Sequence, residues 1–476
     1  MIRFISDDDI EKVHEKTLHL LETVGCLFQH EVVLKKLEKA GARVDMQSHV
    51  VHFPRNLVEE CIKLVPKEYI LAGREAKNDI QFPLGENEFI TRTNTGAPHY
   101  VEPRTYKHRD IITLSQCNDW IRLCDAMEQV DYVACPFIGD VPLNTAGLYA
   151  LRSQFQNSGK HFWIQPYHED TIPYIFEILC AVTGSREELK KRPVAHPTVG
   201  AISPLQYKYM DAEMLKCAGD YGIPVTIYTL PSMGGTAPLT MAGITLLTNA
   251  ELLAGNVVVQ VCNPGTPVHF LGHKFKIDMR TGSAGHSFIE PQLAAAANAE
   301  LSIYKYGIPF HSYGSGSDSM VPDGQSQIER TFQGLLFGLG HGKVFGGLGQ
   351  LETVNAICPT QLVIDNDIIT RIRMARRAIS WDDDQMAADV IAEVGIGGEY
   401  ITHEHTARHC RDAVEARTFN SQSRSDWMQK DGKGGILDNA EDILDAIIEN
   451  HKVPPLPEDI AKEIDDIIES ADRKLN

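Results

Sequence analysis

The sequence predicts an α/β fold, a TIM (β/α)8 barrel with a small N-terminal α+β cap and a helical C-terminal extension. Beyond about residue 110, short apolar runs alternate with helical patterns, and this alternation predicts parallel βα units. Seven such runs, together with one more upstream, make the eight strands that close a barrel. A doubly wound open sheet is the alternative, because a strand count taken from a sequence is imprecise.

The eight strand candidates are short apolar stretches, most of them ending at Gly or at a polar residue. They are 90–96, 131–135, 161–165, 196–202, 224–230, 267–272, 308–314 and 343–349. No GxxxxGK[ST] occurs, and no GxGxxG opens a helix after the first strand. The sequence therefore gives no sign of a nucleotide site.

The front of the chain predicts two helices followed by short strands. The first helix spans residues 6–25, where Ser6 can cap it and Gly25 can end it. The second lies near 31–41, and strand-like pieces follow it. We expect a cap over 1–89, a barrel over 90–365 and a helical extension over 366–476.

The last segment is an amphipathic helix. One face carries Ile460, Ile464, Ile467, Ile468 and Ala471. Such a face needs an apolar partner. We expect the tail either to wrap around the barrel or to form a dimer contact, and we expect a homo-oligomer.

Composition and charge exclude several classes of function. Acidic residues number 64 and basic residues 45, which gives a net charge of -19 and argues against nucleic-acid binding. The ten cysteines are scattered and form no CxxC, and the three His of 403–410 do not share a helix face. We therefore expect no metal site. The N-terminus does not resemble a signal peptide, so we expect a cytoplasmic protein without membrane contact.

Polar and aromatic side chains gather where several predicted strands end. Tyr167 and His168 follow one strand and Tyr228 lies near the end of another. Residues 310–352 contain two Gly-rich turns and supply a further set: Phe310, His311, Tyr313, Gln350 and Glu352. In a barrel of parallel strands these ends form the active site. Alternation along the strand puts Phe310 on the opposite side from His311 and Tyr313.

Each of these residues taken alone is more often a core group than a ligand. Together, several aromatic faces around one mouth are typical of a site for a quaternary ammonium ion, held by cation–π attraction of about 0.5–2 kcal/mol per face. The carboxylate of Glu352 would add a counter-charge.

Longer motifs resemble a known family. They are HEKTLHLLETVGC near the N-terminus, GGTAPLTMAGITLLTNAELLAG, GSGSDSMVPDGQSQIE, GQLE with CPTQLVIDNDI, and HTARHCRDA with RSDWMQKDG. The chain resembles the trimethylamine methyltransferase superfamily, in the branch that lacks pyrrolysine and includes glycine betaine:corrinoid methyltransferases.

The resemblance implies a TIM barrel that transfers a methyl group to the Co(I) centre of a small, separate cobalamin-binding corrinoid protein. The chain itself would bind no cofactor. The trimethylamine enzymes carry pyrrolysine, whose equivalent position here lies near Ser319 or Met320. A tertiary amine is a poor methyl donor without activation, whereas a quaternary ammonium leaves as a neutral amine.

This resemblance implies a quaternary amine as the methyl donor, with glycine betaine first, giving dimethylglycine. Proline betaine, carnitine and γ-butyrobetaine are alternatives, and a non-catalytic quaternary-amine-binding protein is an alternative of another class. The aromatic rings of Phe310, Tyr313, Tyr228 and Tyr167 would face the trimethylammonium group. His311 or His168 would hold the carboxylate, and Gln350 and Glu352 would line the mouth.

Overall fold

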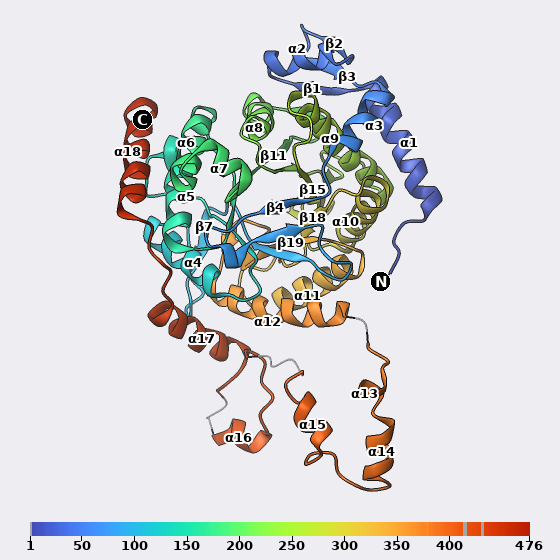
Figure 1. Ribbon diagram of the computed structural model, residues 1–476, viewed down its shortest axis with the longest axis vertical. Coiled ribbons are helices and arrows are strands. Elements are labelled where there is room, and N and C mark those ends of the chain that lie inside the picture. The colour runs from blue at the N-terminus through green and yellow to red at the C-terminus, as the bar shows by residue number, and fades with distance from the viewer. Residues whose placement is uncertain (1, 378, 413–416, 430–432) are drawn as a thin grey trace.

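A closed barrel of eight parallel strands forms the centre of the molecule (Figure 1). The computed structural model describes residues 2–377, 379–412, 417–429 and 433–476. The strand order around the barrel is β10-β11-β13-β15-β18-β19-β6-β9. The barrel strands are β6 (Ile90–Thr93), β9 (Tyr132–Ala134), β10 (His161–Ile164), β11 (Ala195–Ala201), β13 (Val225–Thr229), β15 (Val268–Gly272), β18 (Phe310–Tyr313) and β19 (Val344–Leu348).

Each predicted strand range overlaps one of these strands, so the predicted TIM barrel is confirmed. The open-sheet alternative is wrong, because β19 pairs with β6 and β6 pairs with β9 and these two ladders close the ring. The strands are buried on the inner and outer side, which explains their continuous apolar runs.

Helices surround the barrel. The helices of the barrel layer are α4 (Leu114–Ala126), α5 (Ala146–Asn157), α6 (Ile172–Thr183), α7 (Arg186–Lys191), α8 (Tyr209–Asp220), α9 (Met241–Cys262), α10 (Ile289–Leu301), α11 (Gly324–Leu339) and α12 (Pro359–Arg376). Helix α9 is long and apolar enough to cross a membrane, but 83% of its apolar window is buried inside the protein. It is a core helix, covered by the barrel on one side and by the N-terminal helices on the other.

The N-terminal part packs against helix α9 and against the end of the barrel at which the strands begin. Its elements are α1 (Asp7–Thr23), β1 (Cys26–Phe28), α2 (Glu31–Lys39), β2 (Arg43–Asp45), β3 (Val50–His52), α3 (Arg55–Leu64), β4 (Tyr69–Leu71) and β5 (Ile80–Phe82). Strands β1 to β3 join β12 (Gln206–Tyr207) in a sheet at one edge of the molecule (Figure 1). The two helices and the short strands predicted here are all present, whereas β1 and α3 were not predicted.

The β4–β5 hairpin closes the barrel at the end where the strands begin. Tyr69 Oη lies 2.6 Å from His269 Nε2, and Phe82 stacks near the same imidazole at 4.9 Å. Next to this contact, the Nε2 of His161 lies 2.7 Å from His196 Nδ1. A layer of buried imidazoles therefore forms the lower barrel core.

This layer predicts a loss of stability in mild acid. Burial lowers the pKa of His161 from 6.5 to about 4 and that of His269 to about 3. Between pH 6.5 and these values the unfolded chain binds protons that the folded chain does not. The free energy of unfolding should thus fall as the pH falls below 6.5, by up to about 1.4 kcal/mol per pH unit for each histidine.

Urea unfolding at pH 7 and pH 5 measures this loss. Carboxylates also contribute to acid sensitivity, so the matched control is His269→Asn, which should show a shallower pH dependence than the wild type. Equal slopes for the two proteins would contradict the assignment.

Loops at the opposite end of the barrel form two small sheets around the mouth. One has the order β14-β16-β17 and the other the order β20-β21-β7-β8. Their strands are β7 (His99–Val101), β8 (His108–Arg109), β14 (Ser232–Met233), β16 (Phe275–Ile277), β17 (Ala284–Gly285), β20 (Gln350–Leu351) and β21 (Ala356–Ile357). These segments follow the C-terminal ends of β6, β13, β15 and β19, so this end carries the candidate site.

The C-terminal extension consists of two different parts. Helices α13 (Asp383–Met386), α14 (Ala388–Val394), α15 (Glu404–His409) and α16 (Arg424–Gln429) stand away from the barrel (Figure 1). Helices α17 (Ile436–Asn450) and α18 (Glu458–Leu475) return to it. Ile464, Ile468 and Ala471 are buried against the barrel layer, where α18 contacts α6 and α5. The C-terminal helix α18 therefore packs along the outside of the barrel, as the first of the two expectations for the tail stated.

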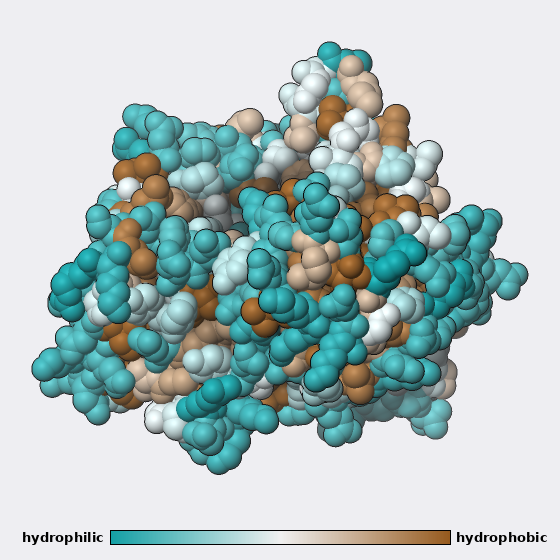
Figure 2. Space-filling model, turned by 90° about the horizontal axis from the view of Figure 1, so that it is seen from above, coloured by the Kyte–Doolittle hydropathy of each residue, from teal (hydrophilic) through white to brown (hydrophobic). Residues whose placement is uncertain are grey.

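The barrel layer continues past the expected domain boundary at 365, because α12 runs from Pro359 to Arg376. The outer surface agrees with the acidic composition. Hydrophilic residues predominate on the face seen in Figure 2, with apolar residues scattered among them.

Candidate functional site

Three of the predicted aromatic residues come together at the barrel mouth. Tyr167 follows β10, Tyr228 lies in β13 and Tyr313 ends β18. Burial raises the pKa of Tyr167, and the neighbouring phenol of Tyr228 contributes. Burial likewise raises the pKa of Tyr228, with Asp211 and Tyr313 contributing. The phenols of Tyr167 and Tyr228 are therefore uncharged at neutral pH.

Tyr167 and Tyr228 are both half-buried side chains at the barrel mouth. Both side chains keep part of their surface open to solvent although burial dominates their pKa. The ring of Phe137 meets Tyr167 edge to face at 5.1 Å. The loop after β6 passes beside it, because a Cβ on Gly96 would lie 3.5 Å from Tyr167 Oη.

A buried arginine lies inside the barrel, beside Trp163 and Tyr313. Arg92, in β6, is 0% exposed, and its guanidinium carbon lies 4.0 Å from the Trp163 ring and 5.1 Å from the Tyr313 ring. Its Nε donates to His311 Nε2 at 3.0 Å, and Nη1 donates to Thr93 O at 2.7 Å. Gly346 makes room for it, because a Cβ there would lie 2.8 Å from Arg92 Nη2.

Two further histidines lie beside Tyr313. The His273 ring is 4.0 Å from the Tyr313 ring, and the His286 ring is 5.0 Å from His273. Burial lowers the pKa of both imidazoles, so they are neutral at pH 7. His273 Nε2 and both nitrogens of His286 have no hydrogen-bond partner among the described residues.

The structure corrects the placement of Phe310. It lies on the outer side of β18, where its ring packs 6.5 Å from Phe337 of α11, and it is 1% exposed. Strand alternation turns His311 and Tyr313 inward and sends Phe310 toward the helices. Phe310 therefore cannot face a ligand in the barrel.

The two candidate carboxylate-binding histidines are separated. His311 lies inside the barrel below the mouth, where it accepts the hydrogen bond from Arg92, and burial holds its pKa well below the usual range. His168 caps the short helix Glu169–Thr171, with its Nδ1 accepting from Asp170 N at 3.3 Å. The His168 side chain therefore stabilises the short helix that it caps.

Gln350 is fully buried and holds a neighbouring loop. Its Oε1 accepts from Ser317 N at 3.0 Å and its Nε2 donates to Ser317 O at 3.2 Å. Glu352 is half-buried, and its Oε2 lies 3.6 Å from His108 Nδ1 of β8. Both shape the loops of the mouth. The predicted pyrrolysine-equivalent position lies beside them, where Ser319 is buried and Met320 is 54% exposed.

A buried ion pair ties these loops to the barrel layer. Arg330 Nη1, in α11, lies 2.8 Å from Asp365 Oδ2 in α12, and both side chains are 0% exposed. Arg330 also donates to Gln350 O at 2.7 Å and to Ser315 O at 3.3 Å. Arg330 thus bonds to both Gly-rich turns, one through Ser315 and the other through Gln350.

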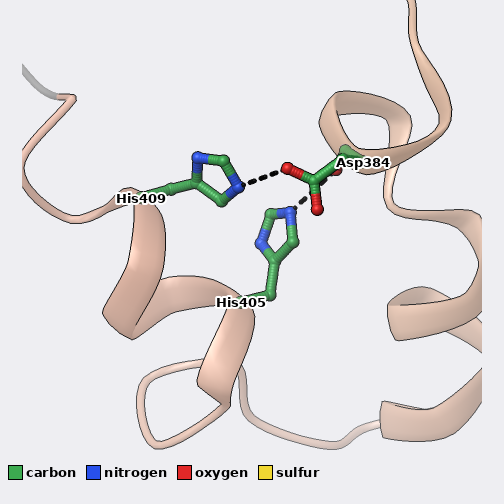
Figure 3. A group of neighbouring side chains, drawn as sticks. All are labelled: Asp384, His405 and His409. Atoms are coloured by element: carbon green, nitrogen blue, oxygen red, sulfur yellow. Dashed lines mark hydrogen bonds and ion pairs between the residues drawn. The ribbon is translucent and has the colours of Figure 1, made fainter.

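One group of potential metal ligands occurs far from the mouth, among the described residues. Asp384, His405 and His409 in the extension each offer one potential ligand atom, and these three atoms lie within 4.8 Å of one another (Figure 3). His409 Nε2 contacts Asp384 Oδ2 at 3.0 Å and its Nδ1 contacts Asp412 Oδ2 at 2.7 Å. The hydrogen bond to Asp412 raises the pKa of His409. Both ring nitrogens of His409 are thus occupied by carboxylates in this arrangement.

Four residues of this region were not among the predicted site residues: Arg92, Trp163, His273 and His286. The predicted strands 90–96 and 161–165 already contained the first two at inward positions, and His273 directly follows a third predicted strand. Alternation applied to every strand would have selected them. Nothing in the sequence places His286, because it follows the short strand β17 in a mouth loop.

Comparison with known proteins gives a consistent result over the whole chain. The family "Trimethylamine methyltransferase (MTTB)" matches residues 1–475. Trimethylamine methyltransferase MttB of Desulfitobacterium hafniense (strain DSM 10664 / DCB-2) is 30% identical over 471 residues, which cover 98% of this chain and 93% of that protein.

A glycine betaine methyltransferase of Desulfitobacterium hafniense (strain Y51) is 28% identical over 459 residues, covering 96% of this chain and 94% of that protein. Among solved structures, the Methanosarcina barkeri monomethylamine methyltransferase (MtmB) has the same fold, with a TM-score of 0.53 and 12% identity, covering 94% of this chain and 89% of that one. The chain therefore belongs to the trimethylamine methyltransferase family and is a methyltransferase that acts on methylated amines.

Proposed function

We propose that the protein takes a methyl group from a quaternary amine, first of all glycine betaine, and passes it to the Co(I) centre of a corrinoid protein. The observation that carries the proposal is the pair of half-buried aromatic side chains, Tyr167 and Tyr228, at the barrel mouth. Aromatic faces of this kind attract a quaternary ammonium ion. The similarity to a glycine betaine methyltransferase supports the same donor.

The absence of pyrrolysine supports a donor that needs no activation. In a quaternary ammonium ion, the C–N bond breaks with its electron pair going to nitrogen, and the amine leaves uncharged. The nucleophile is the cobalt of the acceptor. The residues of this chain would bind the donor, orient one N-methyl group outward and exclude water.

The rim of the mouth offers a surface for the acceptor protein. Loops after β13, β15 and β18 expose large apolar side chains there, namely Leu230, Leu239, Met279 and Met320. Exposed apolar side chains gathered on one face mark interaction sites. We place the corrinoid protein over these residues.

Assembly and location are part of the same proposal. The projecting helices α13 to α16 and their connections expose Ile379, Trp381, Ile391, Ile396 and Ile401, which supports a homo-oligomer. All ten cysteines are free thiols, which fits a reducing cytoplasm.

A donor panel tests the proposal. Glycine betaine, proline betaine, carnitine, γ-butyrobetaine and trimethylamine are each incubated with the protein and reduced free cobalamin, and methylcobalamin is followed by absorbance. We expect product from glycine betaine, with dimethylglycine formed in equal amount, and none from trimethylamine. Turnover of trimethylamine alone would reject the proposal. Binding of quaternary amines by calorimetry without methyl transfer would favour the non-catalytic binding protein.

A further inference from the structure

Arg92 places a positive charge inside the barrel without an acidic partner among the described residues. Its hydrogen-bond partners are the imidazole of His311 and the carbonyl of Thr93, and neither carries a negative charge. Nη2 donates no hydrogen bond to a described residue. A buried charge is costly unless an opposite charge and hydrogen bonds satisfy it. The guanidinium is therefore suited to an anion that comes from outside the chain.

The imidazoles around Arg92 are neutral and leave its charge uncompensated. Burial lowers the pKa of His311 well below the usual range, and the charge of Arg92 is the next cause. The pKa values of His196 and His273 are also lowered, by burial first, with smaller contributions from neighbouring imidazoles and from Arg92. At neutral pH these rings can donate or accept hydrogen bonds but add no negative charge.

Other buried polar atoms on the same interior surface also lack partners among the described residues. They are Trp163 Nε1, Thr198 Oγ1 and His273 Nε2. Trp163 contacts the Arg92 guanidinium, and His273 stacks on Tyr313, the second ring beside that guanidinium. A carboxylate has two oxygens that together accept several hydrogen bonds, and arginine binds such a group with two parallel N–H donors.

We propose that Arg92 binds the carboxylate of the methyl donor, so that the site selects betaines over quaternary amines that are only cations. This inference rests on the proposed function. The guanidinium already covers the faces of Trp163 and Tyr313, so the donor's ammonium group lies further out, against Tyr167 and Tyr228. With the carboxylate on the floor, the N-methyl groups point toward the mouth, where the acceptor approaches.

Selectivity follows from the electrostatics of this arrangement. A donor without a carboxylate would bring a second positive charge near Arg92 and leave the guanidinium unpaired. A site built around a buried polar group discriminates strongly against ligands that cannot pair with it. In a betaine, the carboxylate would pair with Arg92 while the ammonium group lies against Tyr167 and Tyr228. The short spacer between the two groups would set how far apart they bind.

Donor analogues test the proposal on the wild-type protein. Glycine betaine is compared with its methyl ester and with choline, which keep the trimethylammonium group and lack the carboxylate, with reduced free cobalamin as acceptor. We expect kcat/KM for glycine betaine to exceed that for either analogue at least tenfold. Equal values would overturn the role of Arg92 while leaving the proposed function in place. Absence of methyl transfer from every quaternary amine would instead reject the proposed function.

Variants test the residue itself. Arg92→Met should raise the KM for glycine betaine at least tenfold and abolish the preference over choline, whereas Arg92→Lys should keep part of the preference. The matched control is Arg280→Met, at an 88% exposed arginine of the mouth that pairs with Asp278. It should retain the wild-type preference. An Arg92→Met protein that still prefers glycine betaine would overturn the proposal.

A readout without turnover completes the test. Glycine betaine should raise the Tm of the wild type and of Arg280→Met, and choline should raise it less. Arg92→Met should lose the difference between the two ligands. Equal stabilisation of the wild type by both ligands would count against the proposal. If Arg92→Met does not fold, the wild-type donor and Tm comparisons decide the question.

Discussion

Replacing Arg330 by alanine is expected to lower the free energy of unfolding by about 3–5 kcal/mol, because it leaves the Asp365 carboxylate buried without its partner. Both side chains are 0% exposed, and Arg330 Nη1 lies within 3.0 Å of both Asp365 oxygens. Burial lowers the pKa of Arg330 and raises that of Asp365, so each charge depends on the other.

The loss would extend to the mouth, because Arg330 also holds the carbonyls of Ser315 and Gln350. Urea unfolding measures the change. The matched control is Arg109→Ala, which removes a half-exposed partner of Glu102 and should cost about 1 kcal/mol or less. If the two variants lose similar amounts of stability, the ion pair does not anchor the loops as described.

Replacing Tyr228 by alanine is expected to raise the KM for glycine betaine by about 2- to 30-fold, which corresponds to the loss of one cation–π face worth about 0.5–2 kcal/mol. Tyr228 is suited to this test because it is half-buried and lies with the inward-facing cluster that contains Trp163 and Leu271. Its truncation therefore removes one ring of the proposed cation site at modest cost to the core.

The matched variant for this measurement is Tyr228→Phe, which keeps the ring face and removes only the hydroxyl. Steady-state kinetics with reduced free cobalamin should give a KM close to that of the wild type. Phe310→Ala serves as a second control, because that ring lies outside the barrel and should affect the free energy of unfolding more than KM. A Tyr228→Ala protein with unchanged KM would exclude Tyr228 from the cation site.

The barrel was predictable because its signal is local. Each strand is a short apolar run between polar or Gly residues, and the alternation with helices sets the topology. The mouth was predictable only in part. Strand ends drew attention to Tyr167, Tyr228 and Tyr313, which follow or lie in β10, β13 and β18, but periodicity alone did not decide whether Phe310 or His311 faced inward. That choice depends on the tilt and register of β18 against β15 and β19, which pair only in the folded chain.

The floor of the site was harder to predict for a different reason. An arginine in a predicted strand is normally an edge or surface residue, so Arg92 did not suggest a buried site. Its burial follows from contacts with residues distant in sequence, since Trp163, His311 and Gly346 come from three other strands. The projecting helices α13 to α16 differ from the sequence expectation in the other direction. Arg92 is a charged residue that is buried, whereas these helices carry apolar residues that are exposed.

The β4–β5 hairpin affects how ligands can enter and leave the barrel. Tyr69 and Phe82 pack against His269 and cover the lower end of the barrel. In the proposed function, an acceptor docked over the mouth would cover the opening that the donor and the remaining amine use. The donor would then have to bind before the acceptor docks, and the amine would leave after the acceptor has dissociated.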